Sequence, residues 1–328
     1  MDVFGAALDA REFLCDAAVA AAHELGVFAA LGRIAPATCD GLARELGVVA
    51  GRRRLRALLD VLVALGAVIR PPPPAGGDDG AGAEPSFAAA DAAPPCPSVA
   101  RAGWGLLAEV IRADRPLPAD GGADAVRRLH RHLATAGAAA ARELVVHLGD
   151  RSLLDLGAGA GAYSQAFLAA HPGARATLVD RREVLALAAE WLGPLAARAQ
   201  LVEGDAAAVD LGTGHGAAVL ANLLHLHSPD MCARLCAVAA RAVAPGGVVV
   251  VKDLRVDDDR TGPIEGLLFA LNMALYTEAG DVYSNSQLRA WLAQAGLADI
   301  AEHRLTAAPD AIVVVGRRPI EAAGGGRG

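Results

Sequence analysis

The chain has 328 residues, long enough for two domains, and it carries a net charge of −7 with no cationic arm at either end. This charge argues against a nucleic-acid partner, and no apolar run is long enough to span a membrane. Charged residues from Asp2 to Glu12 predict that no signal peptide is present. The chain has five cysteines, Cys15, Cys39, Cys96, Cys232 and Cys236. Because they are scattered and odd in number, they favour a reducing, cytoplasmic location over a disulfide framework. They also predict no metal site.

The first 32 residues are predicted to form two helices, because apolar side chains from Val3 to Leu31 recur at helical spacing. Helices this apolar need burial on more than one side, and a small domain supplies little core. A partner subunit is a natural source of that burial, so we expect a homodimer.

The next segment follows the order of a winged helix. A helix over 38–47 ends at Gly47, a second runs from Arg52 to about Leu65, and an extended segment begins at Val68. The arginine run at 52–54 is predicted to lie on a solvated helix face. Residues 71–97 are rich in Pro, Gly and Ala and are expected to form a flexible wing tip with a short strand near 86–88. Since no basic, base-reading helix is present, we interpret this unit as a dimerisation and lid module.

Further along, residues 98–112 are predicted to form a helix carrying Trp104, 116–122 a loop, and 124–147 a long helix. From Arg151 strands and helices alternate, with strands expected at 152–156, 176–179, 200–203, 217–221, 248–252 and 311–316. This alternation predicts an α/β fold with a parallel, doubly wound sheet. The expected domains are a mostly helical winged-helix domain at 1–120, a cofactor-binding domain at 121–319, and a disordered tail at 320–328.

A glycine-rich turn follows the first of these strands, in the run Asp155–Gly161. Its glycines allow a sharp turn and let a ligand lie against bare peptide groups at a helix N-terminus. Gly157, Gly159 and Ala162 match the dinucleotide pattern G-x-G-x-x-G/A. Asp155, however, suits S-adenosylmethionine better, because a carboxylate there attracts the ammonium of the methionyl group and repels a pyrophosphate.

Two more carboxylates end the next strands. Asp180 can bind ribose hydroxyls, and Asp205 can accept a hydrogen bond from an adenine amino group. Taken alone, Asp180 could also be a helix N-cap and Asp205 a turn residue.

With Leu224-His225 and Pro245-Gly246-Gly247, these motifs follow one another in an order that resembles class I S-adenosylmethionine-dependent O-methyltransferases. The closest resemblance is to the branch with an N-terminal winged-helix dimerisation domain, which includes caffeate-type, hydroxyindole and hydroxyneurosporene enzymes and bacterial natural-product enzymes. It implies a Rossmann-like methyltransferase sheet and methylation of a hydroxyl on a small aromatic or polyketide-like metabolite. The cofactor residues it implies are Asp155, Gly157, Gly159, Gly161, Asp180, Asp205, Ala206 and Asn222.

The resemblance also implies an acceptor site. His225 matches the general base of the family, and the residues expected to line the acceptor pocket are Trp104, His132, Asn272, Met273 and Tyr276. Two departures from the family pattern affect the base. Leu226 and His227 replace an Asp-Trp pair, and Val282 stands where the family carries a glutamate that orients the base. With Val282 in place of that carboxylate, we expect the imidazolium of His225 to lack one usual stabiliser and the base to be weaker than in typical relatives.

Several alternatives remain open from the sequence. The same fold supports C- or N-methylation, and a protein can keep the cofactor and lose transfer. If the chain were an NAD-dependent oxidoreductase, its glycine loop would be accounted for but Asp155 would not. If it were a winged-helix regulator, neither the glycine loop nor Asp155 would be accounted for.

Overall fold

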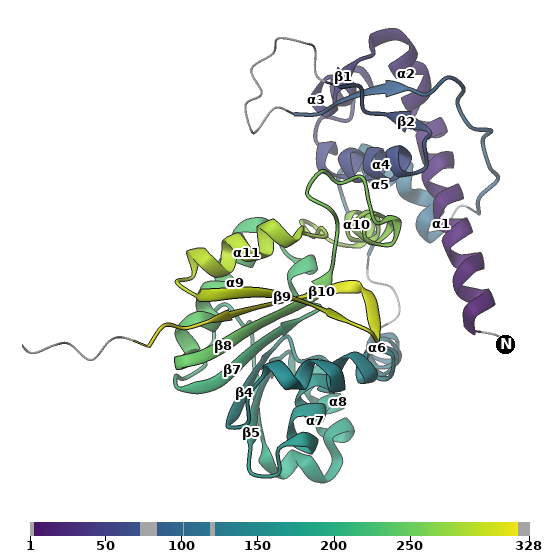
Figure 1. The fold of residues 1–328 in the computed structure, drawn as a ribbon. Helices are drawn as coiled ribbons and strands as arrows, with labels where there is room; N and C mark the ends of the chain where they lie inside the picture. Colours follow the sequence, from purple (N-terminus) through teal and green to yellow (C-terminus); the bar gives the residue numbers. More distant parts are fainter. Residues whose placement is uncertain (1–2, 73–83, 101, 119–121, 321–328) are drawn as a thin grey trace, which may run out of the picture. The chain divides into compact units, whose positions relative to one another are not determined.

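The computed structural model describes residues 3–72, 84–100, 102–118 and 122–320, with the backbone alone for 3–10 and 123. The chain divides into two compact units, 1–118 with 259–282, and 119–258 with 283–328. Figure 1 traces both. The predicted domain boundaries differ in one respect, because the segment 259–282 belongs with the N-terminal unit. Residues 321–328 of the predicted tail (320–328) and residues 73–83 of the predicted wing tip (71–97) lie outside the described residues.

The first unit is mostly helical around a small antiparallel sheet of order β1-β3-β2. Its elements are α1 (Val3–Leu25), α2 (Val27–Ile34), β1 (Ala37–Thr38), α3 (Cys39–Glu45), α4 (Arg52–Ala64), β2 (Val68–Ile69), β3 (Ser86–Ala89), η1 (Gly103–Leu106), α5 (Leu107–Ala113) and α10 (Ile264–Tyr276). The winged-helix order is therefore present. The helix predicted over 98–112 is shorter, because the chain enters η1 only at Gly103, which has φ 53°.

The helices α1 and α2 are separated at Gly26, whose φ of 80° ends the first helix. From Ala17 to Leu31 their apolar side chains are largely buried within the unit itself. The expectation that this stretch lacks a local core is therefore wrong, although Phe13 of α1 stays 42% exposed. No single helix of the described residues is long and apolar enough to cross a membrane. The segments Arg11–Leu25 and Val27–Ile34 reach that length and composition only when taken together, and they form a bent pair.

The arginine run is not the solvated face that the sequence predicts. Arg52 is exposed, Arg53 is half-buried and Arg54 is only 1% exposed. Arg53 donates to the carbonyl oxygens of Gly280 (2.6 Å) and Glu278 (3.1 Å), beyond the end of α10. Arg54 donates to the carbonyl of Ala274 and to Asp114 (3.0 Å). Ala274 is among the last carbonyls of α10, and such carbonyls attract guanidinium groups, so Arg54 joins α4 to the end of α10. Arg53 joins α4 to the turn that follows.

The second unit is a sheet of strand order β6-β5-β4-β7-β8-β10-β9. Its strands are β4 (Ser152–Leu156), β5 (Arg175–Asp180), β6 (Ala199–Glu203), β7 (His215–Ala221), β8 (Val243–Leu254), β9 (Ala298–Leu305) and β10 (Ala308–Arg317). From β6 to β8 the strands are parallel. The far edge departs from the predicted parallel arrangement, because β10 runs antiparallel to β8 and to β9.

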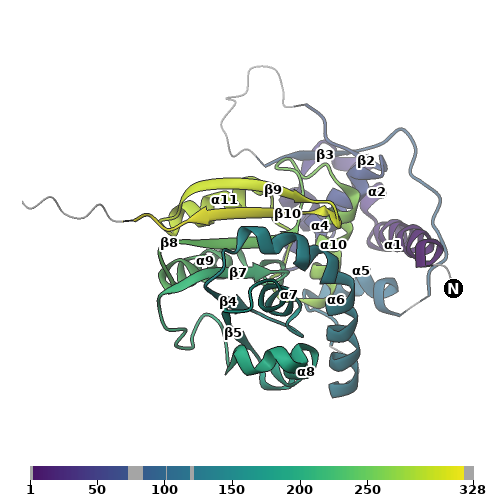
Figure 2. The same cartoon turned by 60° about the horizontal axis from the view of Figure 1, so that its bottom comes forward.

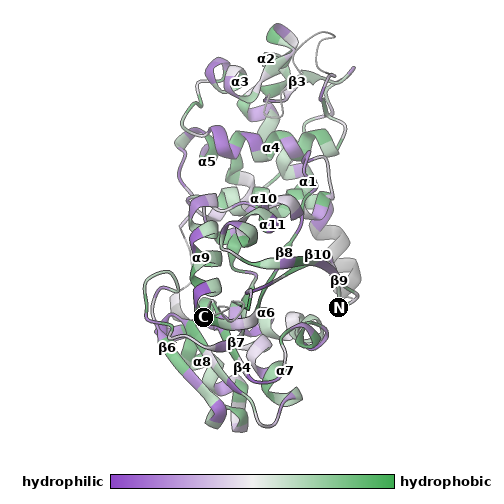
Figure 3. Cartoon of the chain, turned by 60° about the vertical axis from the view of Figure 1, so that its left-hand side comes forward, coloured by the Kyte–Doolittle hydropathy of each residue, from purple (hydrophilic) through white to green (hydrophobic). Residues whose placement is uncertain are grey.

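Helices cover both faces of this sheet, as Figures 1 and 2 show. The helices α6 (Gly122–Leu144), α7 (Ala162–Ala170) and α8 (Arg182–Leu192) pack on one face, with η2 (Val145–His147) and η3 (Gly193–Arg198). The helices α9 (Pro229–Ala242) and α11 (Asn285–Gln294) pack on the other, and η4 (Leu224–Leu226) follows β7. The central strands β4 and β7 are largely hydrophobic (Figure 3), as burial on both faces requires. Cys232 and Cys236 are buried in α9, which confirms them as core residues.

Candidate active site

The carboxyl ends of β6, β5, β4, β7 and β8 form one edge of the second unit, where open α/β sheets bind ligands. The predicted cofactor residues lie along this edge. The glycine loop follows β4, Asp180 ends β5, Asp205 and Ala206 follow β6, and Asn222 follows β7. The parallel order therefore brings into one row residues that are widely separated in the sequence.

The glycine loop is held to the neighbouring strand by its own backbone. The amides of Gly157 and Ala158 donate to the carbonyl of Val179 at 2.9 and 3.1 Å. Gly157, Gly159 and Gly161 have φ values of 68°, 57° and 81°, the left-handed region that favours glycine. A Cβ at Gly157 would lie 2.7 Å from the side chain of Leu223. The loop thus has the close backbone approach that a cofactor-binding turn needs.

The two outer carboxylates have different surroundings. Asp180 accepts the Gly159 amide on one oxygen (2.8 Å) and the Arg181 amide on the other (2.7 Å), and it stays half-buried. Each carboxylate oxygen has a further lone pair, so Asp180 can still accept hydrogen bonds from a ribose. Asp205 is exposed and accepts a hydrogen bond from the amide of Ala207 (2.8 Å). This is the geometry of a turn residue, the alternative role that the sequence analysis gave for Asp205.

Asp155 has a structural partner. Its carboxylate is 1% exposed and accepts the hydroxyl of Ser164 in α7 at 2.6 Å. Burial raises the pKa of Asp155 to about 6, partly offset by the Ser164 bond. This burial argues against a direct contact with the ammonium of the cofactor. In this structure the carboxylate joins the end of β4 to the helix after the glycine loop.

His225 lies in η4, directly after β7, and it is paired with a carboxylate. Its Nδ1 is 2.6 Å from Oδ1 of Asp253 in β8, and its backbone amide donates to Oδ2 at 3.2 Å. Both side chains are buried, His225 being 7% exposed and Asp253 4%. Burial opposes ionisation of Asp253, but His225 and Lys252 hold the pKa of that carboxyl below its usual value. A carboxylate can only accept, so the neutral imidazole carries its proton on Nδ1, and Nε2 is the basic nitrogen.

This pair gives His225 a carboxylate partner that the sequence analysis did not identify. Val282 indeed supplies none, but Asp253 supplies one from the neighbouring strand. Asp253 directly follows the predicted strand 248–252, as Asp180 directly follows 176–179, and that shared position is the signal that could have identified it.

One further side chain of the second unit approaches the cofactor edge. A Cβ on Gly159 would lie 3.5 Å from Nδ1 of His130 in α6, so His130, which the sequence prediction omitted, lies over the glycine loop. Burial lowers the pKa of His130, against the pull of Asp180. His132, which was predicted to line the acceptor pocket, lies exposed on the same helix.

The other predicted acceptor residues belong to the first unit. Trp104 in η1 is buried, and its indole N–H donates to Oδ1 of Asn272 in α10 at 3.2 Å. Met273 is buried, whereas Tyr276 is 42% exposed. A Cβ on Gly103 would lie 3.4 Å from the Tyr276 hydroxyl, so η1 also packs against the end of α10.

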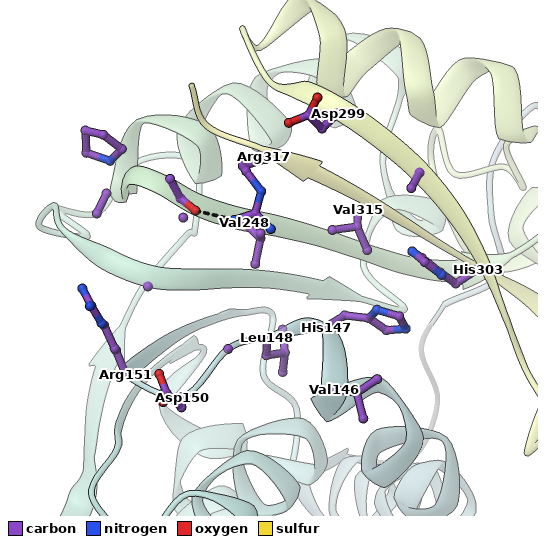
Figure 4. A pocket seen from close by; sticks show the side chains of 17 residues that line it. Val146, His147, Leu148, Asp150, Arg151, Val248, Asp299, His303, Val315 and Arg317 are labelled. Atoms are coloured by element: carbon purple, nitrogen blue, oxygen red, sulfur yellow. Dashed lines mark hydrogen bonds between the residues drawn. The ribbon is translucent and has the colours of Figure 1, made fainter. Parts of the chain in front are cut away.

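A cavity of about 660 Å³ lies at the opposite edge of the second unit's sheet (Figure 4). It is lined by Arg151, Val248 and Arg317 and by His147 and His303, whose rings are 4.2 Å apart. None of the predicted site residues lines it. Among the described residues, no three His, Cys, Asp or Glu side chains gather in a metal-binding group.

Fold and site together define a methyltransferase-type cofactor edge with a histidine–carboxylate pair, and comparisons with known proteins give the same class. The family model for the O-methyltransferase domain matches residues 131–298. The 3-hydroxy-5-methyl-1-naphthoate 3-O-methyltransferase of Streptomyces sahachiroi is 30% identical over 324 residues, covering 90% of this chain and 89% of that protein.

Solved structures agree. An O-methyltransferase family 2 protein from Planctomyces limnophilus, in complex with apigenin, has a TM-score of 0.73 and 25% identity, covering 97% of this chain and 96% of its own. Human N-acetylserotonin methyltransferase, in complex with S-adenosylmethionine, shares the fold with a TM-score of 0.57 and 20% identity, covering 98% and 99%. The chain belongs to the O-methyltransferase family and is an S-adenosylmethionine-dependent enzyme acting on a small molecule.

Proposed function

We propose that this enzyme methylates a hydroxyl group of a small aromatic or polyketide-like metabolite, with His225 as general base. The observation that carries the proposal is the buried His225–Asp253 pair at the cofactor edge. A general base would be of little use for a neutral amine, which is already nucleophilic, so the pair favours a hydroxyl over an amine acceptor.

The residues divide the work as follows. The cofactor supplies a methyl group that is already electrophilic, so the chain needs only to position the acceptor in line and remove its proton. Nε2 of His225 takes the hydroxyl proton, and Asp253 stabilises the imidazolium that forms. The cofactor is held by the backbone of the glycine loop, by Asp180 at the ribose and by Asp205 with Ala206 at the adenine.

The acceptor is proposed to contact α10. Because Oδ1 of Asn272 accepts the Trp104 indole, its amide NH₂ is the group left to donate to an acceptor oxygen. Met273 and Tyr276 follow on the same helix, and His132 is kept as a weaker candidate. The substrate class is supported by the Streptomyces relative, whose name gives a hydroxynaphthoate as its substrate.

The test is a set of hydroxylated naphthoates and flavonoids, with matched amines, incubated with the enzyme and S-adenosylmethionine. We expect S-adenosylhomocysteine to form with a hydroxyl compound and the product to be a methyl ether by NMR. His225→Ala should abolish most of this turnover, while His227→Ala, a half-buried histidine two residues on, serves as the matched control. A product methylated on carbon or nitrogen would overturn the assignment.

Two broader assignments are also proposals. We infer a homodimer formed through the N-terminal unit, supported by the apolar first half of α1, where Phe13 is exposed. Light scattering that gives a monomer mass at micromolar concentration would refute it. A cytoplasmic location is supported by the five cysteines, all of which are free thiols.

A further inference from the structure

Lys252 is the single lysine of this chain; every other basic residue among its 30 lysines and arginines is an arginine. It lies near the end of β8, directly before Asp253, and it is only 7% exposed. An ammonium group is costly to bury, and an apolar side chain would serve the core better. Stability therefore does not explain why the chain places its one lysine here.

The position of Lys252 relates it to the cofactor edge. Along β8 the side chains of Val248 and Val250 pack on the face covered by α6 and α7, and Lys252 continues this alternation. Its Nζ donates to Oδ1 of Asn222 at 2.6 Å, and its carbonyl accepts the Asn222 amide at 2.8 Å. Burial lowers the pKa of Lys252, and the charge of Asp253 opposes this shift.

Asn222 is held in an unusual conformation by these bonds. Its φ is 54°, a region that few residues other than glycine adopt, and it is exposed at the carboxyl end of β7. Since Oδ1 of Asn222 faces the ammonium of Lys252, its NH₂ group is turned away from that ammonium. The hydroxyl of Tyr163 lies beside this NH₂ group, whose second N–H can donate to a ligand. Asn222 and Lys252 together thus present an amide N–H donor next to a positive charge.

This chemistry matches one group of the cofactor. The ribose hydroxyls and the adenine amino group donate hydrogen bonds, and Asp180 and Asp205 are acceptors for them. The methionyl carboxylate is an anion and needs donors. We propose that Lys252 is a positioning residue that orients Asn222 to bind the carboxylate of the cofactor. The proposal rests on the proposed cofactor site and adds to it a residue outside the predicted set.

The test compares two ligands by calorimetry on the full chain: S-adenosylhomocysteine and its decarboxylated analogue, S-adenosyl-3-thiopropylamine. We expect the wild type to prefer S-adenosylhomocysteine by about 10-fold or more, the strength of a charge-assisted hydrogen bond. Lys252→Met should weaken binding of S-adenosylhomocysteine by about 10- to 50-fold and leave the analogue within about 3-fold. Lys252→Gln keeps a hydrogen-bond donor without the charge, so its affinity for S-adenosylhomocysteine should lie between those of the wild type and Lys252→Met.

Because the chain has one lysine, labelling with ¹³C-lysine gives a single Cε signal without any substitution. That signal should shift on addition of S-adenosylhomocysteine and much less with the analogue. Equal weakening of both ligands in Lys252→Met, or a wild type that binds both equally well, would overturn the proposal. A wild type that does not bind S-adenosylhomocysteine at all would instead refute the cofactor site itself.

Discussion

The pairing of His225 with Asp253 leads to the sharpest prediction, for the substitution Asp253→Asn. The change keeps the size of the side chain and removes its charge. It also introduces an NH₂ group where the structure requires acceptors. Oδ1 accepts from Nδ1 of His225 (2.6 Å) and from the Leu254 amide (2.9 Å), and Oδ2 accepts from the His225 amide (3.2 Å).

The magnitude follows from these bonds. A hydrogen bond to a charged group contributes about 1.5–3 kcal/mol, compared with about 0.5–1.5 kcal/mol for a neutral pair. The imidazolium formed during proton transfer would lose that difference, roughly 10-fold in rate. In either orientation the new NH₂ also faces an N–H donor inside the protein, which costs about 1–3 kcal/mol more and disfavours the productive tautomer. Together we expect kcat to fall by about 10²–10³-fold.

The assay is the initial rate of S-adenosylhomocysteine formation with a weakly acidic hydroxyl acceptor, measured between pH 6 and 9. Calorimetry with S-adenosylhomocysteine provides the control, because the cofactor affinity should stay within about 3-fold. A ¹⁵N NMR spectrum of the imidazole reports the tautomer directly. Wild-type turnover by Asp253→Asn across this pH range would refute the reasoning, since the carboxylate would then not act through His225.

Three further predictions can be checked on the same protein. His225→Ala should lower kcat by about 10²–10⁴-fold, least for acidic acceptors, and unchanged turnover of a non-acidic hydroxyl would contradict the base role. Gly159→Val, at φ 57° beneath His130, should abolish calorimetric binding of S-adenosylhomocysteine without loss of the folded circular dichroism spectrum. Burial raises the pKa of Asp155 from 3.8 to about 6, so ionisation of this carboxyl should lower the free energy of unfolding as the pH rises between these two values. Asp155→Asn should therefore raise the free energy of unfolding by up to about 3 kcal/mol at pH 8 and little at pH 4, and an equal gain at both would exclude this origin.

Several features of the fold could be predicted because their signals are local. The strand at 152–156 is an apolar run that ends at a glycine turn, and the structure has it with the same bounds. The winged-helix order and the central parallel strands were likewise predictable from periodicity and from glycines at helix ends. In contrast, β9 was missed, because Ala298–Leu305 is an edge strand with several charged and exposed residues and lacks an apolar run.

The candidate site shows the same division. The sequence determined the glycine loop and the carboxylates that end its strands, because each depends on a few neighbouring residues. Only the tertiary structure decided which charges face a ligand. Asp155 turned inward to Ser164, Arg54 turned inward to the end of α10, and Asp253 came to His225 from 28 positions away. Each outcome depends on which strand or helix packs against the charged group, and burial and pairing across distant segments are not properties of the local sequence.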